Sequence, residues 1–455
     1  MNIYGSIFRR FLNPLWETRL RKRPTLSRVA ELERTEWLSH DELTAIQTRA
    51  FRALLDHSCA HVPFYRDRMK RAGLEPGDLR SLDDVMLLPL VRRPEASENP
   101  DSRVSEIGPA PVIKKGTSGS TGTPLTFGYE WESEYWRQAI RLRGYGWAGY
   151  QQGSRSLHFW GAPVFPKPPV HKRIKVDVDH RIRREVVLPS TLRGDADLLR
   201  VVDAIVSHRP ENIICYAQAG GDLARFINAR GLRRWRDIPV ICGAEKLYAH
   251  DRAAMVEAFG SGIFETYGSR EVMLMASECS AHDGLHVQME NILLEVVVEE
   301  AGRVRSAAPG ESGEIVITDL HNYAMPFIRY VNGDLGTWKK EGRCSCGRAL
   351  VRLASVEGRV TETLRDAEGR AIGGLVYNAM FASLADTVRE FQIVQARDRS
   401  ITVRVIPTER FSTSTETSIR KTHEAHFGSV PLRIEKVAEI PLTSAGKRQP
   451  VVVEK

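Results

Sequence analysis

The sequence lacks any long hydrophobic run, which excludes a membrane-spanning helix. No apolar stretch among the 455 residues approaches the ~20 residues that such a helix needs. The chain begins with a basic, amphipathic segment, MNIYGSIFRRFLNPLWETRLRKRP, which has no continuous apolar core of the kind found in a secretory signal. We therefore expect a cytoplasmic protein whose N-terminal helix docks on its own domain. Contact of this helix with a membrane surface is the alternative.

The sequence also has few cysteines and only a small excess of positive charge. Six cysteines in a chain of this length, in a reducing compartment, argue against a disulfide framework. Lys and Arg number 65 against 57 Asp and Glu, a net charge of +8 that suits phosphate-rich ligands but not a dedicated nucleic-acid-binding protein. No nucleic-acid partner is expected. The sequence contains no internal repeat, and its 42% hydrophobic residues over 455 positions predict two or more globular domains.

Helical and extended patterns alternate through the middle of the chain. The apolar spacing predicts helices at 197–208, 221–231 and 250–260, with strands at 212–219, 238–245 and 263–268. Such alternation is typical of a mostly parallel sheet. Period-2 strands at 286–300 and 313–320 predict a β-rich subdomain, and residues 40–75 predict two helices broken by Pro63. The prediction is an α/β fold: a large N-terminal domain, 1–358, and a small mobile α+β lid, 359–455.

Residues 114–124, KKGTSGSTGTP, contain no apolar side chain. Glycines at 116, 119 and 122 permit a tight path, and the hydroxyl and backbone N–H groups between them suit an anion. The stretch does not fit the Walker pattern, because Thr121 stands where the second glycine would be. Phosphate binding and a flexible linker both remain open on this stretch alone.

Five other short segments carry glycine, aromatic and charged residues: HVPFYR at 61–66, GAE at 243–245, YGSRE at 267–271, RYVNGDLG at 329–336 and SAGKRQP at 444–450. The last four have the order and approximate spacing found in the adenylate-forming enzymes, the superfamily of acyl-CoA synthetases and related ligases. Within it, the sequence resembles the phenylacetate-CoA ligase family and its relatives from polysaccharide gene clusters. The resemblance covers nearly the whole chain.

This resemblance implies a nucleotide site that binds ATP and Mg²⁺. The residues it assigns to ATP are Thr117, Ser118, Ser120 and Thr121 for the phosphates, Gly243, Ala244, Glu245, Tyr267, Gly268 and Ser269 near the adenine, Asp334 for the ribose and Arg359 at the domain junction. Tyr267 would stack on the adenine ring. Glu271 would hold Mg²⁺, a hard cation that prefers carboxylate and phosphate oxygens.

The same resemblance makes Lys447 the catalytic residue. When a carboxylate attacks the α-phosphate of ATP, negative charge builds on the phosphorus and acid oxygens, and a positioned ammonium stabilises it. The small domain would close over the large one for this step and then rotate for the second, with Glu362 as the hinge. One departure is Arg270, which stands where the superfamily usually has threonine and adds a fixed cation near the phosphates.

Three cysteines and a histidine predict a zinc site. Cys279, His286, Cys344 and Cys346 supply the ligand set of a structural Cys₃His site, with no coordination position open for catalysis. The spacing C-x-C is less diagnostic than C-x-x-C, so three reduced thiols beside an unrelated histidine are the alternative. His282 competes with His286 as the fourth ligand.

The carboxylic acid and its acceptor are the least specified features. Many aromatic residues lie between 135 and 216, which favours an aromatic acid, although such residues also fill protein cores. The predicted function is an AMP-forming acyl- or aryl-CoA ligase. An amide-forming ligase with an amine acceptor and a non-catalytic binding scaffold are the alternatives, and a homodimer remains open.

Overall fold

The computed structural model describes residues 3–454, with gaps at 109–112, 117–124, 162–168, 193, 301, 341, 360–362, 370, 374–376, 378–379, 382–383, 385–386 and 443–447. At 359, 363 and 371–373 it describes the backbone alone.

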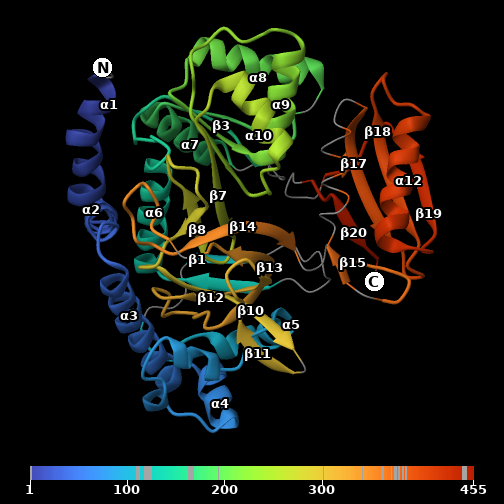
Figure 1. Ribbon diagram of the computed structural model, residues 1–455. Helices are drawn as coiled ribbons and strands as arrows, with labels where there is room; N and C mark the ends of the chain where they lie inside the picture. Colours follow the sequence, from blue (N-terminus) through green and yellow to red (C-terminus); the bar gives the residue numbers. More distant parts are fainter. Residues whose placement is uncertain are drawn as a thin grey trace.

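One mixed sheet forms the centre of the large N-terminal part (Figure 1). Its first strands are β3 (Ser156–Phe159), β4 (Glu185–Leu188), β5 (Asn212–Tyr216), β6 (Val240–Gly243) and β7 (Ile263–Ser269). They are followed by β8 (Met273–Glu278), β9 (Leu285–Val287), β10 (Ile292–Glu300), β11 (Arg303–Ser306), β12 (Ser312–Asp319), β13 (Tyr330–Trp338) and β14 (Arg352–Arg359). Across the described residues these twelve strands follow the order β11-β10-β12-β13-β14-β9-β8-β7-β6-β5-β3-β4.

Strand β7 joins a parallel and an antiparallel half of this sheet. Neighbours from β4 to β7 are parallel, whereas β7 and β8 pair antiparallel, as do the strands from β8 to β11. The predicted α/β fold with a mostly parallel part and a β-rich part is therefore confirmed. The two parts share one sheet, so residues at the end of β7 lie where the two halves meet.

Helices cover the parallel half: α6 (Trp131–Gly146), α7 (Val170–Arg183), α8 (Asp195–His208), α9 (Ala217–Ala229) and α10 (Ala249–Phe259). Strands β5 and β6 are buried along their whole length, as expected for parallel strands covered on both faces. Val201, Leu223 and Met255 from α8, α9 and α10 share one core with Ile213 and Val240. The helices and strands predicted between 197 and 268 are thus present in the predicted order, but residues 217–219, predicted as the end of a strand, form the start of α9.

Helix α2 (Thr25–Thr35) packs against α6, and its Leu32 shares a core with Trp136 and Ile140. The antiparallel half packs against the N-terminal segment that contains α3 (His40–His61), α4 (Pro63–Ala72), η3 (Pro76–Asp78), η4 (Asp83–Leu87), α5 (Arg93–Glu98) and η5 (Pro100–Arg103). A capping box begins α3: the Ser39 hydroxyl accepts from the backbone N–H of Glu42, whose carboxylate accepts from the Ser39 N–H. Pro63 begins α4. The predicted break between two helices is therefore confirmed.

The C-terminal part has its own sheet and core (Figure 1, right). Its elements are β15 (Thr363–Arg365), β16 (Ala371–Gly373), β17 (Val388–Gln395), β18 (Ile401–Pro407), α12 (Thr413–Phe427), β19 (Leu432–Lys436) and β20 (Val451–Val453). Ile393, Val403, Ile419 and Phe427 pack in a core separate from those of the large part. The domain boundary after residue 358 stays a prediction.

Two further features flank the central sheet. A hairpin of β1 (Ile113–Gly116) and β2 (Thr126–Tyr129) borders the glycine-rich stretch. At the N-terminal end, α1 (Ile3–Ile7) continues into the π-helical segments η1 (Phe8–Leu12) and η2 (Leu15–Leu20). No helix in the described part of the chain has the length and apolar character required to cross a membrane.

Candidate active site

The predicted adenine-binding residues lie at the carboxyl ends of β6 and β7. Gly243 ends β6, and a Cβ there would lie 2.7 Å from Thr266 Oγ1 and 3.2 Å from the Trp160 ring, so a side chain would not fit. Ala244 follows with φ at +66°, a left-handed conformation that turns the chain sharply. The carboxyl ends of parallel strands at a change of connection are where α/β sheets bind ligands.

Tyr267 and Asp334 are joined by a hydrogen-bond network. The Tyr267 hydroxyl donates to Asp334 Oδ2 at 2.8 Å, and Asn332 Nδ2 donates to the same oxygen at 3.1 Å and to the Tyr267 hydroxyl at 2.6 Å. Burial and the Asp334 carboxylate raise the pKa of Tyr267, so its phenol keeps the proton that it donates. The structure thus brings two residues 67 positions apart into direct contact.

Glu271 is buried, and Arg137 holds its backbone. Arg137 Nη1 donates to the Glu271 carbonyl oxygen at 2.6 Å. The same guanidinium pairs with the Asp319 carboxylate and lies 4.1 Å from the Tyr129 ring centroid. Both charged side chains of this ion pair are 1% exposed, so each buried charge needs the opposite charge of the other. Arg137 therefore ties the loop of Glu271 to α6, to the end of β12 and to the β1–β2 hairpin.

The same hairpin fixes both ends of the glycine-rich stretch. Gly116 pairs with Thr126, so the two ends of the intervening segment lie on adjacent strands. Lys115 Nζ lies 5.0 Å from the Tyr129 ring centroid, next to Arg137. Burial lowers the pKa of Lys115, and the charges of Arg137 and Arg270 lower it further while Glu134 raises it. Lys115 and Arg137 thus lie at the base of this stretch, where a further cation suits an anionic ligand.

Several predicted residues lie outside the described part of the chain: Thr117, Ser118, Ser120, Thr121, Glu362 and Lys447. Arg359 is described by its backbone, which pairs with Asp334 across β13 and β14. Gly268 lies at a β-bulge where an added Cβ would clash with the Met273 carbonyl oxygen. The Ser269 hydroxyl is buried and has no hydrogen-bond partner within the described residues. A buried polar atom of this kind fits a site whose ligand supplies the partner.

Arg448 connects the C-terminal part to this site. Its backbone N–H donates to Glu245 Oε1 at 3.0 Å, while Glu245 Oε2 accepts from the backbone N–H of Gln218 at 3.2 Å. The Arg448 guanidinium pairs with Asp222 of α9 and with Glu390 of β17, the latter at 2.8 Å. Arg448 is the residue after Lys447, so the chain next to the predicted catalytic lysine is anchored at the predicted adenine-binding segment.

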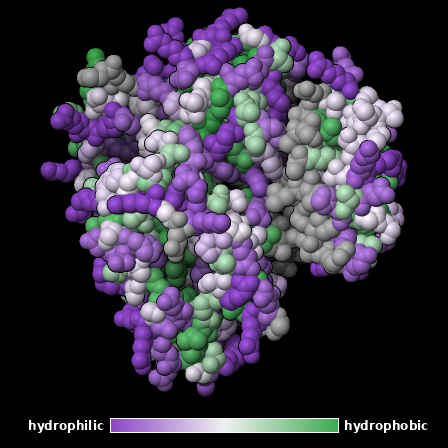
Figure 2. Space-filling model, in the orientation of Figure 1, coloured by the Kyte–Doolittle hydropathy of each residue, from purple (hydrophilic) through white to green (hydrophobic). Residues whose placement is uncertain are grey.

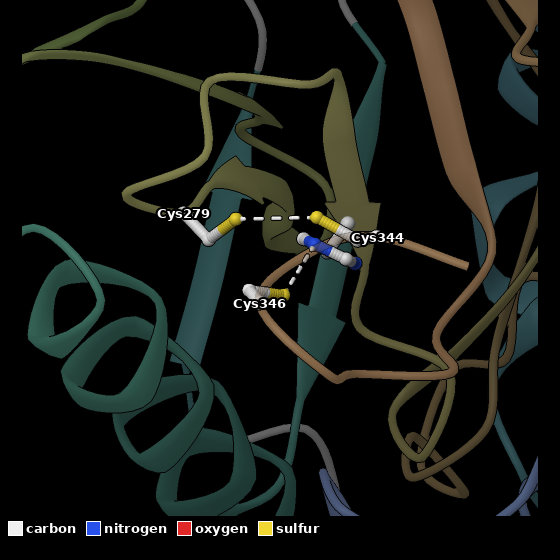
Figure 3. A group of neighbouring side chains, drawn as sticks. Cys279, Cys344 and Cys346 are labelled. Atoms are coloured by element: carbon white, nitrogen blue, oxygen red, sulfur yellow. Dashed lines mark hydrogen bonds between the residues drawn. The ribbon is translucent and has the colours of Figure 1, made fainter. Parts of the chain in front are cut away.

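A separate cluster contains Cys279, His286, Cys344 and Cys346, whose ligand atoms all lie within 4.8 Å of one another (Figure 3). Cys279 Sγ lies 3.7 Å from Cys344 Sγ, and Cys346 Sγ lies 3.4 Å from His286 Nε2. A tetrahedral zinc with Zn–S bonds of about 2.3 Å holds its sulfur ligands about 3.8 Å apart. The donor set and its spacing therefore fit zinc.

Protonation of the cluster also fits a metal. Burial lowers the pKa of His286 to about 4, so its imidazole is neutral at pH 7, the form that coordinates metals. Burial raises the pKa of Cys279 to about 12, and a bound cation would displace that thiol proton. His282 lies outside the cluster: its Nδ1 is 3.4 Å from Glu278 Oε2, and its ring packs against Phe264. The structure thus favours His286 over His282 as the fourth ligand.

Several known proteins resemble this chain in sequence. A protein from Thermus thermophilus named phenylacetate-coenzyme A ligase is 26% identical over 373 residues, covering 80% of this chain and 81% of that protein. A phenylacetate-coenzyme A ligase from Escherichia coli is 26% identical over 359 residues, covering 73% and 75%. The family described as the CapK C-terminal domain matches residues 364–454.

Solved structures share the fold. A 2-hydroxyisobutyryl-CoA ligase in its postadenylation state has a TM-score of 0.73 and 20% identity, covering 93% of this chain and 92% of that one. An open conformation of the same ligase has a TM-score of 0.59, covering 92% of this chain and 93% of that one. The amide bond synthetase McbA from Marinactinospora thermotolerans has a TM-score of 0.50 and 16% identity, covering 74% of this chain and 67% of that one. These likenesses show that the chain shares the fold of these enzymes.

The fold and these relatives define an adenylate-forming enzyme. Within that class the chain is a relative of the phenylacetate-CoA ligases, and its CapK C-terminal domain fits the branch associated with polysaccharide gene clusters. The predicted family and the predicted enzyme class, an AMP-forming acid–thiol ligase, are confirmed.

Sequence reasoning missed the supporting residues of the site. Asn332 could have been found, because it lies two residues before Asp334 on a strand and therefore shares its face. Arg448 could also have been found, because it directly follows Lys447 in the sequence. No sequence pattern marks Arg137 or Asp319 as part of the site, because an arginine on a helix and an aspartate at a strand end are usually solvated.

Proposed function

We propose that this enzyme uses ATP to convert a carboxylic acid into an acyl-AMP with release of pyrophosphate, and then transfers the acyl group to coenzyme A. The observation that carries the proposal is the link between two parts of the chain. Arg448 of the C-terminal part contacts Glu245, beside the strand end that precedes the Tyr267–Asn332–Asp334 network. The residue that precedes Arg448 is the predicted catalytic lysine.

The side chains divide the work of the first step. Tyr267 and Asp334 would bind the adenosine, and Thr117, Ser118, Ser120 and Thr121 would bind the phosphates near the cations Lys115 and Arg270. Glu271 would hold Mg²⁺, with its backbone fixed by Arg137. Lys447 would stabilise the charge that develops between the α-phosphate and the attacking carboxylate.

Two aromatic rings favour a compact aromatic acid as the substrate. Trp160 and Tyr216 meet edge to face at the carboxyl ends of their strands, with ring centroids 4.6 Å apart. Trp160 also lies against Gly243, and Tyr216 is electrostatically coupled to Glu245 and Arg270. An apolar wall beside the nucleotide residues suits an aryl group whose carboxylate faces the phosphates.

An amine acceptor is the second candidate, favoured by the likeness to an amide bond synthetase. The two candidates share the first step and differ in the nucleophile that displaces AMP. Coenzyme A and a panel of amines therefore separate them without any change to the enzyme.

The first experiment measures pyrophosphate release from ATP across aryl, fatty and hydroxy acids, with and without coenzyme A. We expect release with one acid class, and stimulation by coenzyme A because thioester formation frees the site of acyl-AMP. Stimulation by amines instead would identify an amide-forming ligase. ATP binding by calorimetry with no release for any acid would contradict an acid-activating function for the tested classes.

Purified protein is also expected to contain about one zinc per chain, because four protein ligands at tetrahedral spacing bind the ion without an open position. The Cys344→Ser variant should lose most of this zinc. Cys59→Ser is the matched control, since Cys59 is a half-buried thiol away from the cluster. A zinc content below about 0.2 per chain in protein never exposed to chelator would rule out the site.

A further inference from the structure

The N-terminal segment exposes an unusual number of large apolar side chains. Phe11 is 65% exposed and Leu20 64%, whereas Phe8 on the opposite face is 5% exposed. The exposed set in this segment is Ile3, Tyr4, Ile7, Phe11, Leu12, Leu15, Trp16 and Leu20. One face of the segment therefore docks on the protein through Phe8, and the other presents aromatic and aliphatic side chains to the outside.

Helix α7 lies next to this segment and, like it, exposes both apolar and basic side chains. The Tyr4 hydroxyl donates to the Ile182 carbonyl oxygen at 2.7 Å, and the Arg184 guanidinium lies 5.2 Å from the Tyr4 ring centroid. No residue of α7 is buried. Val170, Ile174, Val178 and Ile182 follow one another at intervals of four and are each at least 47% exposed. We call residues 3–23 together with α7 and Arg184 the N-terminal basic face.

Positive charge is concentrated on this face. Residues 3–23 contain six Lys or Arg and one acidic residue, and residues 170–184 contain six Lys or Arg and two acidic residues. The face therefore carries a net charge of +9, whereas the whole chain carries +8. The remainder of the protein sums to −1, so these two segments account for the net positive charge of the chain. In Figure 2 hydrophilic and apolar side chains alternate along the upper left edge, over α1.

We propose that the N-terminal basic face binds the surface of an anionic lipid bilayer. Helices with Lys and Arg beside Trp, Phe and Leu lie in the plane of the interface, with apolar side chains between the acyl chains and basic groups at the phosphates. Trp16 and Tyr4 are residue types that prefer this boundary. The protein does so without a membrane-spanning helix in its described residues.

A second copy of this chain fits the same face poorly. A symmetric dimer would bring two identical surfaces together, each with a net charge of +9. Like charges at that density repel, whereas anionic lipid headgroups neutralise them. The charge complementarity therefore selects the lipid surface over self-association.

The test is co-sedimentation of the full chain with vesicles of phosphatidylcholine alone and of phosphatidylcholine mixed with phosphatidylglycerol. The protein should partition onto the anionic vesicles, and high salt should weaken the binding by screening the basic groups. The Phe11→Glu, Leu15→Glu double variant should bind at least about tenfold more weakly, because it removes two large apolar contacts and adds two repelling charges.

The matched control is the Leu199→Glu, Val206→Glu variant, which makes the same two changes at exposed apolar positions of α8. It should bind like the unchanged protein. A second variant, Lys172→Glu with Lys175→Glu at two exposed positions of α7, alters charge alone and should also reduce binding. Pyrophosphate release and thermal unfolding show that each variant is folded.

Three results would overturn the proposal. The first is no preference of the unchanged protein for anionic vesicles. The second is equal loss of binding in the α8 control, which would show a nonspecific effect of negative charge. The third is light scattering that gives a dimer for the unchanged protein and a monomer for the Phe11→Glu, Leu15→Glu variant, which would assign the face to a second copy.

Discussion

Replacing Lys447 by alanine is expected to slow acyl-adenylate formation by about 10²–10³-fold, because the enzyme loses a cation positioned at the charge that develops in the transition state. The second half-reaction, started from preformed acyl-AMP, should keep most of its rate. The resemblance predicts that the C-terminal domain rotates before this half-reaction, which would withdraw Lys447 from the nucleotide. Single-turnover assays of the two half-reactions measure the two rates separately.

The contacts of Arg448 are the structural basis for this expectation. Its backbone N–H reaches Glu245, and its guanidinium joins Asp222 of the large part to Glu390 of the C-terminal part. These bonds hold the chain next to Lys447 at the proposed nucleotide site.

The matched control is Lys421→Ala, an exposed lysine on α12 of the same C-terminal part. It should leave both half-reactions unchanged. Equal slowing of both half-reactions by Lys447→Ala would show that the lysine acts through folding or domain docking and not in adenylation. An unchanged first half-reaction would remove Lys447 from the chemistry.

Much of the fold could be predicted because its signals are local. The continuous apolar runs at β5 and β6, each between amphipathic helices, indicated buried parallel strands. The cysteine cluster could be predicted because its ligand types are rare and few other thiols compete. The choice between His282 and His286 could not, because it depends on the pairing of β9 with β14, which places His286 beside Arg352 and near the β13–β14 loop.

The supporting charges of the site could not be predicted, because they are joined by long-range packing. Arg137 and Asp319 are 182 positions apart, and Arg448 and Asp222 are 226 apart. In the sequence each looks like a solvated surface residue. In the folded protein β12, α6 and the loop of Glu271 pack together, which buries Arg137 and places it between them. Its role in holding this loop therefore follows from its burial and not from its residue type.

Replacing Asp319 by alanine is accordingly expected to lower the free energy of unfolding by about 3–5 kcal/mol, because it leaves the Arg137 guanidinium buried without its partner. Urea unfolding at pH 7 measures this change. Glu299→Ala is the matched control: Glu299 pairs with Arg92 at 2.7 Å, but the two side chains are 48% and 43% exposed. That exposed pair should contribute at most about 1 kcal/mol.

The same variant also tests whether Arg137 positions Glu271. Without Asp319 the guanidinium keeps its hydrogen bond to Ser133 but loses its ion-pair partner, so we expect its 2.6 Å hydrogen bond to the Glu271 carbonyl to weaken. Protein that is still folded at low temperature should therefore need more Mg²⁺ for half-maximal pyrophosphate release, whereas the Glu299→Ala variant should not.

The Arg137→Met, Asp319→Leu double variant removes both charges and should be more stable than Asp319→Ala, since no buried charge is left unpaired. If it regains stability but not the original Mg²⁺ requirement, Arg137 acts on the metal site as well as on the fold. If Asp319→Ala is no less stable than Glu299→Ala, the buried pair does not support this site.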